Sequence, residues 1–237
     1  MKEFHYDFSK KIALVTGAGR GIGASLSIEL CKRGAIVVGV ARSATELQET
    51  ERMAGKNFIS MPTDISDVQQ IKSLFQNLES KRLIPSIVIN NAGAIAVKIV
   101  EEISMDDYDM MMKVNVRATF LISQEVFRRA KDETSILNVS SIAGVMGLEK
   151  YPGFSVYTAA KSAVVGMTEA MAVEGRARKI WVNVVCPGAV DTRMLRQALP
   201  NMKTDKKPED VVGPFLAVIE KSFLESLTGR VEVLGND

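Results

Sequence analysis

The sequence predicts an α/β protein of one domain, with helices on both faces of a doubly wound, seven-stranded parallel sheet. Short runs of β-branched residues alternate with longer amphipathic segments along the whole chain, which is typical of parallel strands joined by helical crossovers. No linker rich in Pro, Gly or Ser and no internal repeat interrupts this alternation. A chain of 237 residues is also within the range that one core can enclose.

The individual elements follow from the spacing of the apolar residues. Strands are expected at residues 12–15, 36–40, 58–61, 87–90, 136–139, 181–185 and 231–234. Helices are expected at residues 22–33, 44–54, 67–80, 105–130, 155–176 and 209–224. Ser66 is the expected cap of the third helix, and Gly34 is expected to end the first one in the left-handed conformation. Residues 191–207 have no steady period, so a mobile substrate loop with at most a short helix is expected there.

Composition argues against several classes of partner. Lys and Arg number 30 against 28 Asp and Glu, a formal charge of +2, which gives no general attraction for nucleic acid or an anionic membrane. A single histidine, His5, makes a metal site unexpected. The isolated cysteines Cys31 and Cys186 favour a reducing compartment. Residues 1–11 are polar and no apolar run reaches membrane-spanning length, so a cytoplasmic location is expected.

A glycine-rich turn directly follows the first predicted strand. It reads Thr16-Gly17-Ala18-Gly19-Arg20-Gly21-Ile22-Gly23. A strand that enters a helix through glycines exposes backbone N–H groups at the positive end of the helix dipole, and this arrangement binds a pyrophosphate. Taken alone, the turn could also be only a tight connection between a strand and a helix.

Further motifs lie at the ends of the predicted strands and on the helices. They are Asn90-Asn91-Ala92-Gly93 after the fourth strand, Asn115 in the 105–130 helix, Ser140-Ser141 at the end of the fifth strand, Tyr157-Thr158-Ala159-Ala160-Lys161 in the next helix, and Pro187-Gly188-Ala189-Val190-Asp191-Thr192 after the sixth strand. Together with the glycine turn, and in this order, they resemble the short-chain dehydrogenase/reductase family over residues 11–234. The resemblance implies a Rossmann-like fold and an oxidoreductase that uses a nicotinamide dinucleotide.

Four of these residues are the expected catalytic set: Asn115, Ser141, Tyr157 and Lys161. Tyr157 and Lys161 are four positions apart, so they share one face of a helix. A free tyrosine has a pKa of about 10, which a nearby ammonium group lowers. Tyr157 would then donate a proton to the substrate oxygen during reduction, and Ser141 would hold that oxygen. The resemblance implies that Asn115 anchors a water linked to Lys161, and that Lys161 binds the nicotinamide ribose.

Each catalytic residue also has a purely structural interpretation. Tyr157 could be a half-buried aromatic residue, Lys161 a solvated neighbour, Ser141 a turn cap and Asn115 a polar residue that bends its helix. The interval of 16 positions from Ser141 to Tyr157 is longer than the family usually has, which leaves Ser140 as an alternative catalytic serine. The chain also ends in Gly235-Asn236-Asp237, where the family often has an Asp-Gly-Gly tail.

The end of the second strand favours NADP(H) over NAD(H). An acidic residue at this place binds the ribose hydroxyls of NAD and repels a 2′-phosphate. Here Ala41 takes that place and Arg42 follows, while Arg20 in the glycine turn can approach the same phosphate. Guanidinium groups suit a phosphate dianion, although both arginines could be merely exposed. Asp64 is expected beside the adenine or as a turn cap.

The complete set of expected cofactor-binding residues combines these motifs. It comprises Gly17, Gly19, Arg20, Gly21, Ile22, Gly23, Ala41, Arg42, Asp64, Ile65, Asn90, Ala92, Gly93, Tyr157, Lys161, Pro187, Gly188, Val190 and Thr192.

The expected function is hydride transfer between NADP(H) and a carbonyl or alcohol carbon of a small substrate. A second possibility is reduction of a 3-oxoacyl thioester on an acyl-carrier protein, whose phosphopantetheine could meet Arg193, Arg196 and Lys203. A third is a regulatory module that binds NADP(H) without turnover, although such a module needs no proton relay.

The sequence also indicates the wall of the substrate pocket and the assembly. Met146, Leu148, Phe154 and Met194 suggest an apolar wall, although Met and Phe are more often core residues. The helices at 105–130 and 155–176 pair between subunits in relatives. A homodimer or homotetramer is therefore expected.

Overall fold

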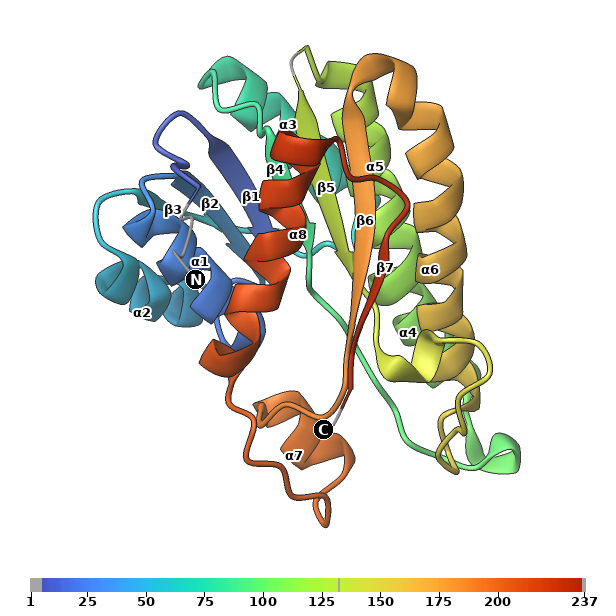
Figure 1. Ribbon diagram of the computed structural model, residues 1–237. Helices are drawn as coiled ribbons and strands as arrows, with labels where there is room; N and C mark the ends of the chain where they lie inside the picture. Colours follow the sequence, from blue (N-terminus) through green and yellow to red (C-terminus); the bar gives the residue numbers. More distant parts are fainter. Residues whose placement is uncertain (1–5, 132, 236–237) are drawn as a thin grey trace.

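In the computed structural model, which describes residues 6–131 and 133–235, seven strands form one sheet in the order β3-β2-β1-β4-β5-β6-β7 (Figure 1). Their bounds are β1 Ile12–Thr16, β2 Ile36–Ala41, β3 Phe58–Pro62, β4 Ile87–Asn90, β5 Thr134–Val139, β6 Ile180–Pro187 and β7 Val231–Leu234. Every neighbouring pair is parallel. The strand order reverses between β1 and β4, and in such sheets the carboxyl ends of the strands at this point border a crevice.

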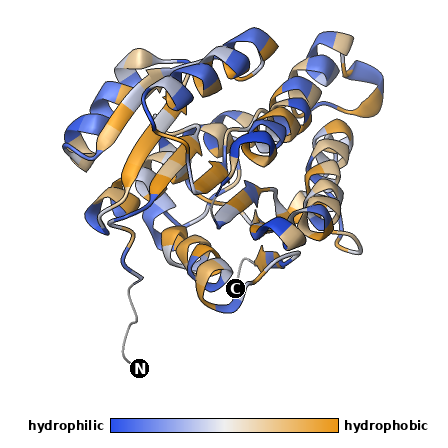
Figure 2. Ribbon diagram, turned by 90° about the horizontal axis from the view of Figure 1, so that it is seen from above, coloured by the Kyte–Doolittle hydropathy of each residue, from blue (hydrophilic) through white to orange (hydrophobic). Residues whose placement is uncertain are grey.

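Helices cover both faces of the sheet, as the sequence predicts. Their bounds are α1 Gly21–Lys32, α2 Ala44–Ala54, α3 Val68–Ser80, α4 Met105–Met111, α5 Ala118–Arg129, α6 Ser155–Gly175, α7 Arg193–Ala198 and α8 Val212–Glu225. Seen from above, hydrophobic strands lie between helices of mixed hydropathy (Figure 2). The fold is thus a single Rossmann-like domain, and the predicted fold class is confirmed.

The core has two main parts, one on each face of the sheet. Leu26 of α1, Leu47 of α2 and Phe215 of α8 belong to one cluster, and Ile71 of α3 and Ile122 of α5 to the other. Side chains of a strand alternate between its two faces. Because helices cover both, the central strands are apolar at nearly every position instead of alternating with polar residues.

The helix predicted at residues 105–130 is not one regular helix. It consists of α4, a π-helical stretch at Met112–Arg117, and α5. Asn115 lies inside the π-helical stretch, and its Nδ2 donates hydrogen bonds to the carbonyls of Met111 (2.9 Å) and Ala94 (2.8 Å). A widened turn of this kind is common at functional sites.

The helix ends agree with one of the two local predictions. Gly34 follows α1 with a φ of +92°, as expected. The prediction that Ser66 caps the third helix is wrong, because the cap is Asp67, whose carboxylate accepts from the N–H groups of Gln69 (2.8 Å) and Gln70 (3.3 Å). The helix predicted from residue 209 begins as a 3₁₀ turn at Pro208–Val211 and continues as α8.

The remaining sequence expectations concern the segment 191–207, membrane spans, metal sites and the cysteines. The segment 191–207 contains one short helix, α7. Within the part of the chain that the structure describes, no helix is long and apolar enough to cross a membrane, and no three His, Cys, Asp or Glu side chains are grouped to hold a metal ion. Cys31 and Cys186 are free and buried. His5 and residues 236–237 lie outside the described residues.

Candidate active site

A cleft of about 590 Å³ lies at the carboxyl ends of the strands. The glycine turn and the ends of β2, β4, β5 and β6 line it together with residues 188–202. In Figure 1 α7 lies below the sheet at this edge. The cleft thus coincides with the crevice that the strand order creates between β1 and β4.

Most of the residues expected from the sequence line this one cleft. They are Gly17, Gly19, Arg20, Gly21, Ile22, Ala41, Arg42, Asp64, Ile65, Ala92, Gly93, Ser141, Tyr157, Lys161, Pro187, Gly188, Val190 and Thr192. Gly23, Asn90 and Asn115 do not line it. The Nδ2 of Asn90 donates instead to Asn138 (2.9 Å) on the adjacent strand β5, so Asn90 supports the sheet behind the cleft.

The glycine turn leaves the start of α1 open to an anion. Gly17 and Gly21 have φ values of +68° and +57°, a conformation that L side chains rarely adopt. A Cβ on Gly23 would lie 2.3 Å from the carbonyl oxygen of Gly17, so helix α1 can pack on the turn only with glycine there. The first residue before α1, Arg20, makes no side-chain cap. The N–H groups of the first turn are therefore available to a ligand.

Thr16 and Asn91, which the sequence argument did not single out, join the glycine turn to the loop after β4. Oγ1 of Thr16 accepts from the N–H groups of Asn91 and Ala92, both at 3.0 Å. Nδ2 of Asn91 donates to the carbonyl of Thr16 at 2.9 Å. These bonds hold the carboxyl ends of β1 and β4 together. Both residues lie inside predicted motifs, but their role depends on the strand pairing.

Tyr157 and Ser141 meet in the cleft. Tyr157 is on α6 and almost fully buried, and its hydroxyl is hydrogen-bonded to the Ser141 side chain. Burial raises the pKa of Tyr157 to about 12, and the bond from Ser141 opposes this only in part. The sequence argument expected Lys161 to lower this pKa. In the structure burial dominates, because Nζ of Lys161 donates to the carbonyl of Val139 (2.9 Å) and lies 5.8 Å from the centre of the Tyr157 ring.

Lys161 is itself buried, with 4% of its surface exposed. Burial lowers its pKa to about 8, and the nearby Cys186 opposes this shift. Gly93 leaves room for the ammonium group, since a Cβ there would lie 3.6 Å from Nζ of Lys161 and 3.1 Å from Oδ1 of Asn115. Asn115 in turn holds the loop after β4, because its Oδ1 accepts from the N–H of Ala94 at 3.1 Å.

The two candidate serines point in different directions. Oγ of Ser140 donates to the main-chain carbonyl of Lys161 at 2.8 Å and is buried. The Ser141 side chain is instead the hydrogen-bond partner of the Tyr157 hydroxyl. The extra residues before Tyr157 form an exposed loop around Glu149 and Lys150, so the longer interval does not displace Ser141 from the site.

Both arginines that the sequence argument assigned to the cofactor line the cleft. Arg20 forms an ion pair with Glu46 of α2 at 2.8 Å, a partner that the sequence argument did not foresee. Arg42 and Ala41 line the cleft beside it. Asp64 both lines the cleft and closes a turn, because its carboxylate accepts from the N–H of Ser66 at 2.9 Å.

The other end of the cleft, next to Tyr157, is apolar. Its lining includes Ile95, Met110, Val114, Ile142, Phe154, Met194, Leu199 and Met202. Of the wall expected from the sequence, Phe154 and Met194 line the cleft, but Met146 and Leu148 do not. The rings of Tyr151, Phe154 and Tyr157 follow one another at centroid distances of 5.6 Å, so one side of this pocket is a row of aromatic rings.

The fold and the site together define a nicotinamide-dependent oxidoreductase of the short-chain type, and the comparison with known proteins agrees. The chain belongs to the short chain dehydrogenase family, which it matches over residues 11–203. It is 37% identical to a hydroxynaphthalene reductase-like protein of Metarhizium brunneum over 78% of this chain and 70% of that protein. It is 32% identical to versicolorin reductase 1 of Dothistroma septosporum over 93% and 87% of the two chains.

Solved structures show the same fold along nearly the whole chain. A short-chain dehydrogenase/reductase mutant from Serratia marcescens has a TM-score of 0.87 at 29% identity, covering 97% of this chain and 98% of the other. A short-chain dehydrogenase from Burkholderia cenocepacia in complex with NADP has a TM-score of 0.84 at 27% identity, with the same coverage. A 4-hydroxyisoleucine dehydrogenase complexed with NADH reaches 0.83 at 27% identity, covering 94% and 96%.

Proposed function

We propose that the protein transfers a hydride between NADP(H) and a carbonyl or alcohol carbon of a small apolar cyclic substrate, with Tyr157 as general acid and base. The observation that carries this proposal is the placement of Tyr157. Tyr157, whose hydroxyl is hydrogen-bonded by Ser141, lines the same cleft as the apolar side chains and the uncapped start of α1.

The residues of the cleft fit a nicotinamide dinucleotide. The uncapped start of α1 suits the pyrophosphate, and Lys161 and Tyr157, which line the same cleft, would contact the nicotinamide ribose. The bound cofactor would supply or accept the hydride. Similar structures contain either NADP or NADH, so the choice of NADP(H) rests on this chain's own Ala41, Arg42 and Arg20.

The chain's own groups would then manage the proton and the substrate oxygen. A phenol whose pKa is raised to about 12 is protonated at neutral pH, which is the form needed to donate a proton in carbonyl reduction. Ser141 would donate a second hydrogen bond to the same oxygen. Asn115 keeps the loop with Gly93 in place through Ala94, so that Lys161 has room beside the phenol.

The lining of the pocket supports a flat, apolar ring system as substrate. Aromatic side chains pack well against other ring systems, and Tyr151, Phe154 and Met194 all line the pocket. Relatives are named as acting on hydroxynaphthalene and versicolorin. The 3-oxoacyl thioester alternative is less favoured, because Arg193 and Arg196 already pair with Glu46 and Asp191.

A substrate panel tests the activity. NADPH oxidation is measured with mono-, bi- and tricyclic ketones, a linear 2-ketone and a 3-oxoacyl thioester. We expect the highest kcat/KM for bi- or tricyclic ketones. Preference for the acyl thioester would favour the acyl-carrier alternative, and binding of NADPH with no turnover on any substrate would favour a regulatory module.

The cofactor preference is tested at Ala41. Ala41→Asp should shift the ratio of kcat/KM for NADPH to that for NADH towards NADH by roughly ten- to hundredfold, because the carboxylate would repel the 2′-phosphate and bind the ribose hydroxyls. Arg42→Ala should weaken the binding of NADPH and leave the binding of NADH unchanged. A wild type that prefers NADH, or an Ala41→Asp variant with an unchanged ratio of kcat/KM for the two cofactors, would contradict the assignment of NADP(H) from Ala41 and Arg42.

We also propose a homodimer or homotetramer in a reducing, cytoplasmic setting. Phe120 on α5 and Val173 on α6 are 42% and 70% exposed, and apolar residues on these helices suit a contact between subunits. The free, buried Cys31 and Cys186 suit a reducing compartment. Light scattering at micromolar concentration tests the assembly. A mass corresponding to a monomer would contradict it.

A further inference from the structure

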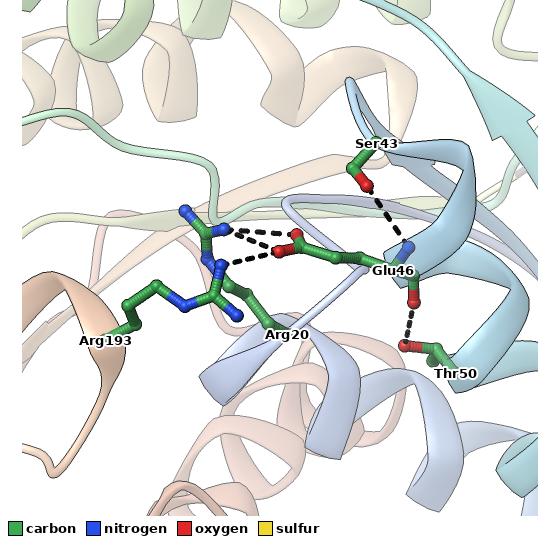
Figure 3. A network of polar contacts seen from close by, with 5 residues as sticks. All are labelled: Arg20, Ser43, Glu46, Thr50 and Arg193. Atoms are coloured by element: carbon green, nitrogen blue, oxygen red, sulfur yellow. Dashed lines mark hydrogen bonds and ion pairs between the residues drawn. The ribbon is translucent and has the colours of Figure 1, made fainter.

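The carboxylate of Glu46 contacts two guanidinium groups at the end of the cleft proposed for the dinucleotide (Figure 3). Nη1 of Arg20 is 2.8 Å from Oε1 and 3.1 Å from Oε2 of Glu46, and Nη1 of Arg193 is 2.7 Å from Oε1. Arg20 belongs to the glycine turn, Glu46 to the first turn of α2, and Arg193 is the first residue of α7. One carboxylate therefore connects three elements that surround the cofactor end of the cleft.

The main chain of Glu46 is fixed close to the glycine turn. Its N–H donates to Oγ of Ser43 and its carbonyl accepts from Oγ1 of Thr50, both at 3.2 Å. Thr50 also donates to the carbonyl of Ala18 in the turn at 3.0 Å. Gly19 is in direct contact with this helix, since a Cβ there would lie 2.9 Å from Cβ of Glu46. The main chain of Glu46 is thus fixed at a position from which its carboxylate reaches Arg20.

Glu46 carries its charge at neutral pH. Burial of the carboxyl group raises its pKa, but the hydrogen bonds from Arg20 and Arg193 outweigh this and leave the pKa below its ordinary value. Its side chain is 26% exposed, against 47% for Arg20 and 51% for Arg193. A second anion approaching Arg20 would therefore meet a guanidinium that already binds a negative charge.

We propose that Glu46 is a specificity-determining residue, whose carboxylate competes with the 2′-phosphate of NADP(H) for Arg20 and so limits the preference for NADP(H) over NAD(H). This inference rests on the proposed function, in which Arg20 and Arg42 bind that phosphate. NAD(H) has a single 2′-hydroxyl in place of the phosphate, so it does not compete for Arg20 and is not repelled by Glu46. Removing the charge should therefore strengthen the binding of the phosphorylated dinucleotide alone.

The test uses the fragments 2′,5′-ADP and 5′-AMP, which differ by the 2′-phosphate. Calorimetric titration compares the wild type with Glu46→Gln and with the control Glu49→Gln. Glu49 is on the same helix and is exposed, and it pairs only locally with Arg52 at 2.7 Å. The control thus removes the same charge without touching Arg20, and circular dichroism checks that both variants are folded.

We expect Glu46→Gln to bind 2′,5′-ADP about three- to tenfold more tightly than the wild type. This range corresponds to the loss of one partly exposed ion pair with Arg20 and of the repulsion between Glu46 and the 2′-phosphate. The affinity for 5′-AMP should stay unchanged in both variants, and Glu49→Gln should bind both fragments as the wild type does. If Glu46→Gln binds 2′,5′-ADP with the same affinity as Glu49→Gln, or more weakly than the wild type, the proposed role of Glu46 is contradicted. If the wild type itself does not prefer 2′,5′-ADP over 5′-AMP, the proposed use of NADP(H) fails instead.

Discussion

Tyr157 and Lys161 lie one helical turn apart on α6, and burial acts on their pKa values in opposite directions. It raises the pKa of the phenol to about 12 and lowers that of the ammonium group to about 8. Burial disfavours the charged form of each group, an anion in one case and a cation in the other. At neutral pH the phenol is therefore uncharged, whereas most Lys161 side chains still carry their proton. Two predictions at the scale of single residues follow from this site.

The first prediction concerns the two serines. Ser141→Ala should lower kcat by roughly ten- to a thousandfold, because the variant loses a hydrogen bond to the oxygen on which charge develops. Ser140→Ala should have a much smaller effect on kcat, since the Ser140 hydroxyl donates to the main-chain carbonyl of Lys161 and not to Tyr157. Steady-state kinetics of both variants decide between the two. The reverse order of effects would show that Ser140 is the catalytic serine.

The second prediction is a pH dependence of stability caused by Lys161. Its pKa in the folded protein is about 8, below the ordinary 10.5. Between these values the unfolded chain binds more protons than the folded one, so the free energy of unfolding rises with pH, and this contribution is lost as the pH falls through 8. The free energy of unfolding is measured by urea for the wild type and Lys161→Met. The value for the wild type minus that for the variant should grow by about 1–3 kcal/mol from pH 7 to pH 10. Parallel pH profiles of the two proteins would contradict the low pKa.

At the scale of secondary-structure elements, the apolar period predicted nearly every strand and helix but not their irregular ends. All seven strands lie within two residues of the predicted bounds, because a strand buried on both faces is a continuous apolar run. The π-helical stretch at Met112–Arg117 was not predictable in this way. Within this stretch Asn115 contacts Ala94, in a loop that is 21 positions away in the sequence.

The cap of α3 gives a prediction at this scale. Asp67 accepts hydrogen bonds from two N–H groups of the first turn, so Asp67→Ala should lower Tm by about 2–4 °C. The sequence alone favoured Ser66 because a serine and a glutamine at capping-box spacing are present. Ser66→Ala is the matched control and should change Tm by less than about 1 °C. A larger loss with Ser66→Ala in thermal unfolding would restore the serine as the cap.

At the scale of the whole molecule, the cleft gathers residues from both halves of the sheet. The motifs that line it were predictable, since each is contiguous in the sequence and either follows a strand or lies on one face of a helix. The contact of Glu46 with Arg193 was not, because the two residues are 147 positions apart and nothing in either neighbourhood indicates the other. Of the four residues predicted for the apolar end of the cleft, only Phe154 and Met194 line it. Met146 is instead 84% exposed.

The central claim, that Tyr157 donates the proton in an NADPH-dependent reduction, is tested most directly by Tyr157→Phe. The measurement is kcat for reduction of a bicyclic ketone at saturating NADPH, together with the Kd for NADPH from its fluorescence. General acid–base assistance contributes about 10²–10⁴-fold, so we expect kcat to fall by that factor while Kd stays within about threefold, since the hydroxyl is a small part of the cofactor contacts. A folded Tyr157→Phe variant that binds NADPH and keeps more than about a tenth of the wild-type rate would contradict the claim.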